Sequence, residues 1–193
     1  MGPNAAEARI LDATKRCCQK RGVAKVTIDD IAAASGVSRA TLYRLFPGGK
    51  EVLFSALQVR ELTEFFDRLT AEAAETVRIG DFEDLVVCLI VTATRELRAD
   101  EHIALMLGSE PGEMLSELTI DGLPRIISVA TRYLTPLVRP YLSENQAAVA
   151  IDIVVRLTIS YFLAPSDTID LGDPISTRHF IRRGLASLAL SRT

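Results

Sequence analysis

The chain is poor in the residues on which disulfides and metal sites depend. Its 193 residues include three cysteines and two histidines. Cys17 and Cys18 are neighbours in a helical pattern and cannot easily bridge each other, so the cysteines predict no disulfide framework and fit a reducing cytoplasm. His102 and His179 have no acidic or cysteine neighbour at ligand spacing, so we expect no metal site.

The sequence motifs of common enzyme classes are also missing. The chain has no Ser/His/Asp order with a nucleophile elbow, no GxGxxG and no phosphate-binding loop. An enzyme is therefore the less favoured class, and we expect no cofactor. The chain also has no internal repeat and no low-complexity tract.

Long hydrophobic runs are scarce. The N-terminus is charged and rich in alanine, without the apolar run of a signal peptide. The most apolar segment, 147–163, is short for a membrane span and contains Asp152 and Arg156. Because these two charges lie one helical turn apart, they can pair. We interpret the segment as a buried helix, and we expect a cytoplasmic protein with no membrane partner.

Positive charge is concentrated in the first third of the chain. The net charge of −3 combines +5 over residues 1–60 with −8 over the remaining 133 residues. A basic head on an acidic body suggests that the head meets a polyanion. Chance clustering of solvated charge is the alternative explanation.

Hydrophobic spacing predicts an all-α protein, because no segment shows the alternation of a strand. Capping residues, glycines and prolines mark the ends of the expected helices. These helices cover about residues 5–21, 28–35, 38–46, 50–78, 82–98, 124–142, 144–163 and 174–190, with shorter helical pieces over 101–124 and a loop over 164–173.

The segment VTIDDIAAASGVSRATLYRLF, residues 26–46, has the pattern of two helices that cross through a short turn. Such a pair needs a small residue at the contact, a residue that tolerates positive φ at the turn, and an apolar plug. Ala32, Gly36 and Leu42 supply them at the offsets of a helix-turn-helix. The second helix begins with a polar, basic run, 38–41, whose N-terminus can hold a phosphate. An ordinary helical hairpin with a glycine turn is the alternative.

This segment resembles the TetR family of transcriptional regulators. The resemblance covers about residues 8–54 and rests on Thr27, Ile31-Ala32, Ser35-Gly36-Val37-Ser38, Thr41-Leu42-Tyr43, Phe46 and Lys50. The chain departs from the family pattern at Leu45, where histidine is common, and at Pro47-Gly48-Gly49, where two residues are more common than three.

The resemblance implies a domain organisation and a function. Residues 1–49 would form a three-helix DNA-binding domain with the helix-turn-helix, and residues 50–193 a larger helical domain for ligand binding and dimerisation. The family's members are homodimers that bind a palindromic double-stranded DNA operator, usually as repressors, and a small molecule releases them. The residues themselves leave repressor and activator open.

Candidate DNA contacts lie on the second helix of the motif and at nearby helix starts. Arg39 and Arg44 are long enough to reach base edges, and Ala40 is small enough to approach a thymine methyl group. The hydroxyls of Thr41 and Tyr43 are expected on phosphates. Plain solvation of each basic residue, and packing of Tyr43 on the first helix, are the alternatives. The full set is Lys25, Thr27, Ser38, Arg39, Ala40, Thr41, Tyr43, Arg44 and Lys50.

The larger domain offers an apolar set of candidate pocket residues. A lining rich in phenylalanine and leucine favours an apolar effector. Any helical core needs such residues, so a plain core role is the alternative for each. The set is Phe65, Phe66, Leu69, Val86, Leu89, Ile90, Leu105, Met106, Ile127 and Tyr133.

The apolar segment 147–163 also predicts a dimer interface. Because it is apolar on nearly all sides, it must be covered on both faces. One face can pack on its own domain, and another can join the last helix against a partner to form a four-helix interface. The candidates are Ile151, Val155, Ile159, Ile181, Leu185 and Leu188.

Dimerisation suggests how a ligand could control binding. Two heads related by a two-fold axis would meet half-sites about 34 Å apart. A ligand that binds the two states with different affinity could shift the helix starting at Lys50 and change that separation. The other alternative is an architectural or protein-binding helical module that does not distinguish sequences, for which DNA binding would fall uniformly with salt.

Overall fold

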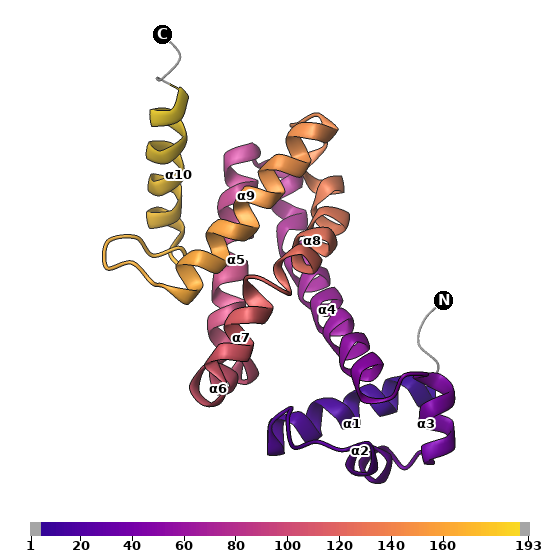
Figure 1. The fold of residues 1–193 in the computed structure, drawn as a ribbon. Helices are drawn as coiled ribbons and strands as arrows, with labels where there is room; N and C mark the ends of the chain where they lie inside the picture. Colours follow the sequence, from indigo (N-terminus) through magenta and orange to yellow (C-terminus); the bar gives the residue numbers. More distant parts are fainter. Residues whose placement is uncertain (1–4, 190–193) are drawn as a thin grey trace. The chain divides into compact units, whose positions relative to one another are not determined.

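The computed structural model describes residues 5–189, with side chains described up to Arg183, and the regular secondary structure of these residues is entirely α-helical (Figure 1). This confirms the all-α prediction. The chain divides into two compact units, one ending at Thr63 and the other beginning at Glu64. The sequence placed the boundary before Lys50, whereas in the structure the next fourteen residues belong to the N-terminal unit.

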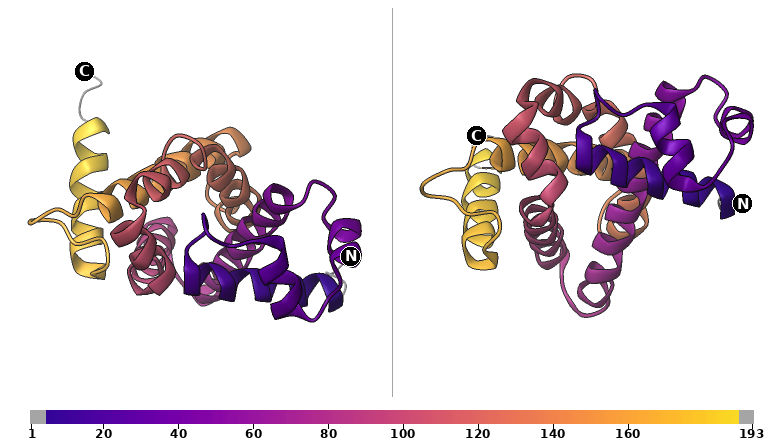
Figure 2. Two further views of the ribbon diagram at one scale, coloured as in Figure 1. Left: turned by 60° about the horizontal axis from the view of Figure 1, so that its bottom comes forward. Right: turned by 90° about the horizontal axis from the view of Figure 1, so that it is seen from below.

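The N-terminal unit contains α1 (Ala5–Arg21), α2 (Ile28–Ser35), α3 (Arg39–Leu45) and the first half of α4 (Lys50–Ile79). Figure 2 shows the three short helices clustered around the start of α4. Leu53 and Leu57 extend the core of this unit into α4, which explains the later boundary. The buried core residues are Ile10, Leu11, Ala13, Cys18, Val26, Ile31, Val37, Leu42, Phe46, Leu53 and Leu57.

Local chemistry fixes the ends of α2 and α3. Thr27 and Asp30 form a capping box at the start of α2, and Gly36 ends that helix with φ 67° and ψ 21°. A left-handed residue at a helix C-terminus favours glycine, because other side chains meet steric strain there. Ser38 caps α3 by accepting a hydrogen bond from the Thr41 backbone N–H. All three features were predicted from the sequence.

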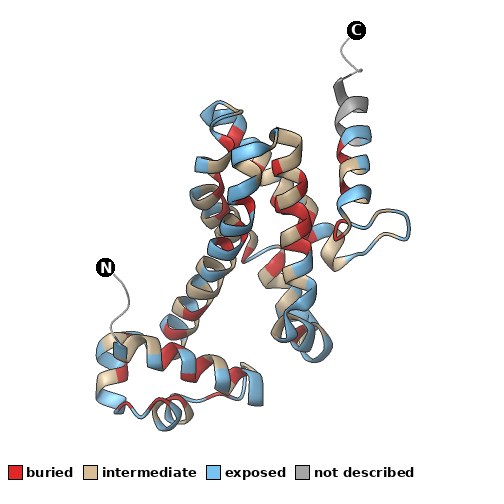
Figure 3. Ribbon diagram, turned by 180° about the vertical axis from the view of Figure 1, so that it is seen from behind, coloured by how far each residue is buried: buried red, intermediate tan, exposed pale blue. Residues whose placement is uncertain are grey.

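The C-terminal unit is built around α5 (Phe82–Ala99), whose residues are densely buried (Figure 3). It also contains α6 (Glu101–Ser109), α7 (Pro111–Leu118), α8 (Leu123–Val138), α9 (Glu144–Leu163) and α10 (Pro174–Ala189). Both α9 and α10 pack against α5, and α8 packs against α9. Helix α8 ends at Val138, before the predicted Leu142, because Pro140 has no N–H with which to continue the helix.

Ion pairs hold α10 against the first turn of α5. Arg178 donates to Glu83 and Asp84, each at 2.7 Å, and Arg182 donates to Glu83 at 3.0 Å. The hydrogen bonds from Arg182 and Arg178 lower the pKa of the Glu83 carboxyl. A bond from Arg178 likewise lowers the pKa of Asp84. These contacts anchor the last helix that the structure describes.

Helix α9 is long and apolar enough, by length and composition, to cross a membrane. Its most apolar window has a mean hydropathy of 1.5, and 28% of that window is buried within the chain. The predicted pair between Asp152 and Arg156 is present, with the Arg156 Nε 2.8 Å from the carboxylate. One side of α9 packs in the core, and the other side carries exposed apolar residues.

Candidate nucleic-acid interface

Helices α2 and α3 meet around a fully buried plug. Leu42 of α3 and Ile31 of α2 are both 0% exposed, and Val37 in the turn packs in the same core. Ala32 is half-buried, as a small residue near the helix contact can be. The packing holds α3 rigidly on α2 and leaves the opposite side of α3 at the surface. This is the arrangement of a helix-turn-helix, in which the second helix enters the major groove.

The outer side of α3 is polar, basic and exposed. Arg39, Ala40 and Arg44 are exposed, and Thr41 is half-buried beside the Ser38 hydroxyl, 3.0 Å away. The Tyr43 side chain is 52% exposed. Its ring lies beside Gly49: the Tyr43 Cε1 is 3.3 Å from the position that a Cβ would take on that glycine. Arginines, hydroxyls and a small alanine on one exposed helix can contact both base edges and phosphates.

Two aspartates at the start of α2 each pair with an arginine. Arg39 pairs through its Nη2 with the Asp29 carboxylate, and Arg21 of α1 lies 2.5 Å from Asp30. Asp30 also accepts hydrogen bonds from the Thr27 hydroxyl and the Thr27 backbone N–H, at 2.7 and 3.0 Å. These bonds, with a smaller contribution from Arg21, lower the pKa of the Asp30 carboxyl. Arg39, predicted to contact bases, is therefore already held by an acidic neighbour.

Two other residues predicted to contact DNA, Lys50 and Thr27, instead bond to groups of the protein itself. The Lys50 Nζ donates to the backbone carbonyls of Val23 and Ala24, at 3.0 and 3.3 Å, and lies 5.3 Å from the centre of the Phe54 ring. The Thr27 hydroxyl is occupied by the capping box. Lys25, in contrast, is exposed. Sequence reasoning missed the Lys50 contact, because the lysine and its acceptors are more than twenty residues apart.

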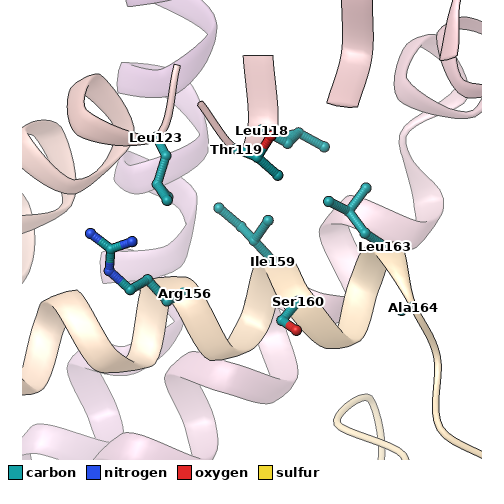
Figure 4. Close-up of a pocket in the computed structure, with 8 residues that line it drawn as sticks. All are labelled: Leu118, Thr119, Leu123, Arg156, Ile159, Ser160, Leu163 and Ala164. Carbon is teal, nitrogen blue, oxygen red and sulfur yellow. The ribbon is translucent and has the colours of Figure 1, made fainter. Parts of the chain in front are cut away.

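A pocket of about 310 Å³ lies in the C-terminal unit between the end of α7, the start of α8, and α9 (Figure 4). Leucine and isoleucine side chains dominate it, and the Arg156 guanidinium lies at one end, beside Leu123 (Figure 4). Asp152 binds the Nε of that arginine. The lining residues are Leu118, Thr119, Leu123, Arg156, Ile159, Ser160, Leu163 and Ala164.

The ten residues predicted to form a pocket do not line this one. Five of them are buried in the packed core: Phe66, Leu69, Leu89, Ile90 and Met106. Phe66 also stacks on Tyr133, with ring centres 5.9 Å apart, and meets Phe65 edge-on at 5.1 Å. Val86 packs against the α5–α10 core, Ile127 is half-buried, and Leu105 is 48% exposed. Most of these residues therefore pack in the helical core, which was the alternative to the pocket role predicted for them.

The predicted dimer residues on α9 point into their own chain. Ile151, Val155 and Ile159 are at most 8% exposed. Ile181 of α10 packs with Val87, Ile90 and Val91 of α5. Leu185 and Leu188 lie outside the residues whose side chains are described. The apolar residues that α9 leaves exposed are instead Val149, at 60%, and Ile153, at 51%. These two, one helical turn apart, form what we call the outer face of α9.

Comparison with known proteins identifies the family. Residues 10–57 match the family model described as bacterial regulatory proteins, tetR family, and residues 90–174 match the one described as bacterial tetracyclin repressor, C-terminal domain. The chain belongs to the TetR family. It is therefore a DNA-binding transcriptional regulator of the helix-turn-helix class.

Individual relatives of this TetR-family regulator span most of its length. The HTH-type transcriptional regulator AlkX of Mycobacterium tuberculosis is 26% identical over 181 residues, which cover 88% of this chain and 84% of AlkX. An uncharacterised HTH-type regulator of Mycobacterium bovis is 30% identical over 132 residues, covering 64% of this chain and 66% of the relative, slightly less than two thirds. The crystal structure of the TetR-family repressor AlkX from Dietzia sp., implicated in biodegradation of n-alkanes, is 24% identical, with a TM-score of 0.66, and covers 97% of this chain and 98% of that one.

The contacts of Lys50 lead to a prediction about its part in DNA binding. Lys50→Met removes the ammonium but keeps an apolar stem over Phe54. We expect it to destabilise the N-terminal unit by about 1 kcal/mol, through the lost hydrogen bonds to Val23 and Ala24. The dependence of DNA binding on salt should stay unchanged, because this ammonium is not available to a phosphate. Binding measured at several salt concentrations checks the prediction.

The matched control is Lys25→Met, since Lys25 is exposed. If Lys25 meets a phosphate, its replacement should reduce the slope of log affinity against log salt by about 0.9. The same reduction for Lys50→Met would mean that Lys50 leaves its carbonyl partners and contacts DNA as the sequence predicted.

Proposed function

We propose that this TetR-family regulator is a cytoplasmic homodimeric repressor that binds a palindromic operator and is released by a small apolar effector. The observation that supports the proposal best is the exposed, N-capped α3, which presents Arg39, Ala40 and Arg44 from a rigid core. A helix that must fit the major groove needs both this rigidity and this polar surface.

The proposed contacts divide into base-reading and phosphate-binding residues. Arg39 and Arg44 contact base edges, where an arginine on guanine contributes about 1–3 kcal/mol of discrimination. Ala40 approaches a thymine methyl group. Thr41, Tyr43 and Lys25 bind phosphates, which fixes the position of the head on the duplex without reading its sequence. Ser38 orders the start of α3 as its cap.

The outer face of α9 is the proposed dimer contact. Val149 and Ile153 are both more than half exposed, and burying them against a second copy would remove apolar surface from water. A two-fold axis at this face gives self-complementary contacts and makes the two DNA-binding heads equivalent. Equivalent heads require a palindromic site with half-sites about one helical turn apart.

Replacing Ile153 with aspartate tests the dimer directly. Because its side chain is exposed in the single chain, the charge should leave the fold intact while opposing burial at a dimer interface. We expect a monomer in sedimentation experiments, with operator affinity reduced at least tenfold. Ile79→Asp is the control, since Ile79 is 71% exposed at the end of α4. An Ile153→Asp protein that remains dimeric and binds normally would rule out this face.

The pocket beside α9 is the proposed effector site. Its leucines and isoleucine suit an apolar molecule, and its volume is at the lower end of the range for ligand pockets, about 300–1,000 Å³. The similar AlkX of Dietzia, implicated in biodegradation of n-alkanes, favours a hydrocarbon-like effector. Effector binding would shift α4 and so change the separation of the two DNA-binding heads. Helix α4 can transmit this shift because it is continuous across the boundary between the units. This requires that the effector binds the DNA-free state more tightly.

A further inference from the structure

Asp29 is an acidic residue on the surface that, in our proposal, meets a polyanion. It lies in the first turn of α2, next to Asp30, but the two carboxylates have different environments. Asp30 closes the capping box with Thr27 and pairs with Arg21. Among the described residues, the Asp29 carboxylate pairs with the Arg39 guanidinium. Its side chain is 58% exposed, so it contributes little to the core.

A carboxylate in this position should weaken DNA binding. It repels phosphates, and it neutralises an arginine that could otherwise bind one. The helix start itself is already capped by Thr27. Besides its favourable place in the first turn of α2, where an acidic side chain stabilises the helix, Asp29 acts on the neighbouring Arg39.

We propose that Asp29 is a positioning residue that makes Arg39 selective for its base, an inference that rests on the proposed role of α3 as the recognition helix. Arginine has a long side chain with several rotatable bonds, and an unrestrained guanidinium can bind any nearby phosphate. The ion pair runs through Nη2, which carries one hydrogen on each two-donor edge of the guanidinium, so the other Nη2 hydrogen can still act with its neighbouring Nε–H or Nη1–H as a pair of donors. A planar guanidinium held from one side presents a fixed donor edge, which matches the paired acceptors of guanine.

The same carboxylate also penalises incorrect sites. When Arg39 meets guanine, the arginine remains between the carboxylate and the acceptors, and the charges alternate. When no acceptor faces Arg39, the ion pair stays electrically neutral, so the arginine adds no attraction to the DNA backbone. Asp29 thus lowers affinity for random DNA more than affinity for the operator, and selectivity rises at a cost in total binding.

Two substitutions at Asp29 test the proposal in the full-length protein. Asp29→Ala removes the carboxylate, and Asp29→Asn keeps an acceptor without the charge. Affinities are measured by fluorescence anisotropy, on a selected operator and on a random-sequence duplex of the same length, at two salt concentrations. For Asp29→Ala we expect affinity for random DNA to rise and the operator-to-random ratio to fall, each by about two- to fivefold, as for other exposed ion pairs. Asp29→Asn should fall between wild type and Asp29→Ala.

A double-mutant cycle distinguishes positioning from a general charge effect. In an Arg39→Ala background, Asp29→Ala should still raise affinity for random DNA but should leave the operator-to-random ratio unchanged. An unchanged ratio for Asp29→Ala in the wild-type background would overturn the proposal, as would an equal fall in both backgrounds. A wild-type ratio near one would instead mean that the proposed function itself fails. Circular dichroism of each variant confirms that α2 remains folded.

Discussion

Replacing Arg39 with alanine is expected to reduce the preference for the operator over random DNA by about ten- to one-hundredfold, as for the loss of one arginine–guanine contact. Arg39 is the first residue of α3, its side chain is exposed, and its guanidinium pairs with Asp29. Affinity for random DNA should change far less, because Arg39 meets no matching base there and is only one of several basic residues near the DNA. Competition binding with labelled operator and random duplexes measures both quantities.

Tyr43→Phe is the control for this result. It removes only the hydroxyl of an exposed ring, and a hydroxyl on a phosphate contributes to register rather than sequence. We therefore expect Tyr43→Phe to weaken binding to all duplexes alike. If Arg39→Ala lost affinity equally on operator and random DNA, Arg39 would be a phosphate contact and not a base-reading residue.

Replacing Leu42 with alanine is expected to destabilise the N-terminal unit by about 2–5 kcal/mol, the usual cost of truncating a fully buried leucine. Leu42 is 0% exposed and packs in the core shared by α1, α2 and α3. Since small domains are stable by only about 5–15 kcal/mol, a loss of this size threatens the whole motif. DNA binding should fail while the helices of the C-terminal unit persist. Urea unfolding followed by circular dichroism and by DNA binding separates the two units.

The same substitution at an exposed leucine provides the control. Leu105 is 48% exposed on α6, so Leu105→Ala leaves little cavity and should change stability by less than about 1 kcal/mol. Equal stability losses for Leu42→Ala and Leu105→Ala would contradict the packing that the structure gives to the helix-turn-helix.

Much of the fold was predictable because local chemistry determines it. The ends of α1 and α2 follow from Gly22, the Thr27–Asp30 capping box and Gly36, which all act within a few residues. The turn Pro47-Gly48-Gly49 also has a local cause. Gly48 and Gly49 have φ 114° and 70°, so this longer turn depends on residues that tolerate positive φ.

The surfaces of the C-terminal unit were harder to predict, and α9 shows why. Its sequence is apolar on nearly all sides, so periodicity does not identify the inward face. The structure turns Ile151 and Val155 inward and leaves Val149 and Ile153 outside. The pocket was hard to predict for a similar reason, since it depends on how the end of α7 and the start of α8 pack against α9.

The contacts of individual DNA-facing residues were also beyond sequence reasoning. Arg39 and Lys50 look alike as exposed basic candidates in the sequence. In the structure, one pairs with an acidic neighbour on α2 and the other bonds to two carbonyls beyond α1. Both partners come from the tertiary arrangement of the helices, which residue spacing alone does not specify.

Selection of fragmented host genomic DNA by the purified protein, near physiological salt and followed by sequencing, tests the central claim most directly. A dimeric, sequence-reading regulator should enrich one short palindrome with half-sites about one helical turn apart. Broad recovery of fragments with no shared motif would contradict this account, because the head would then respond to charge or shape alone.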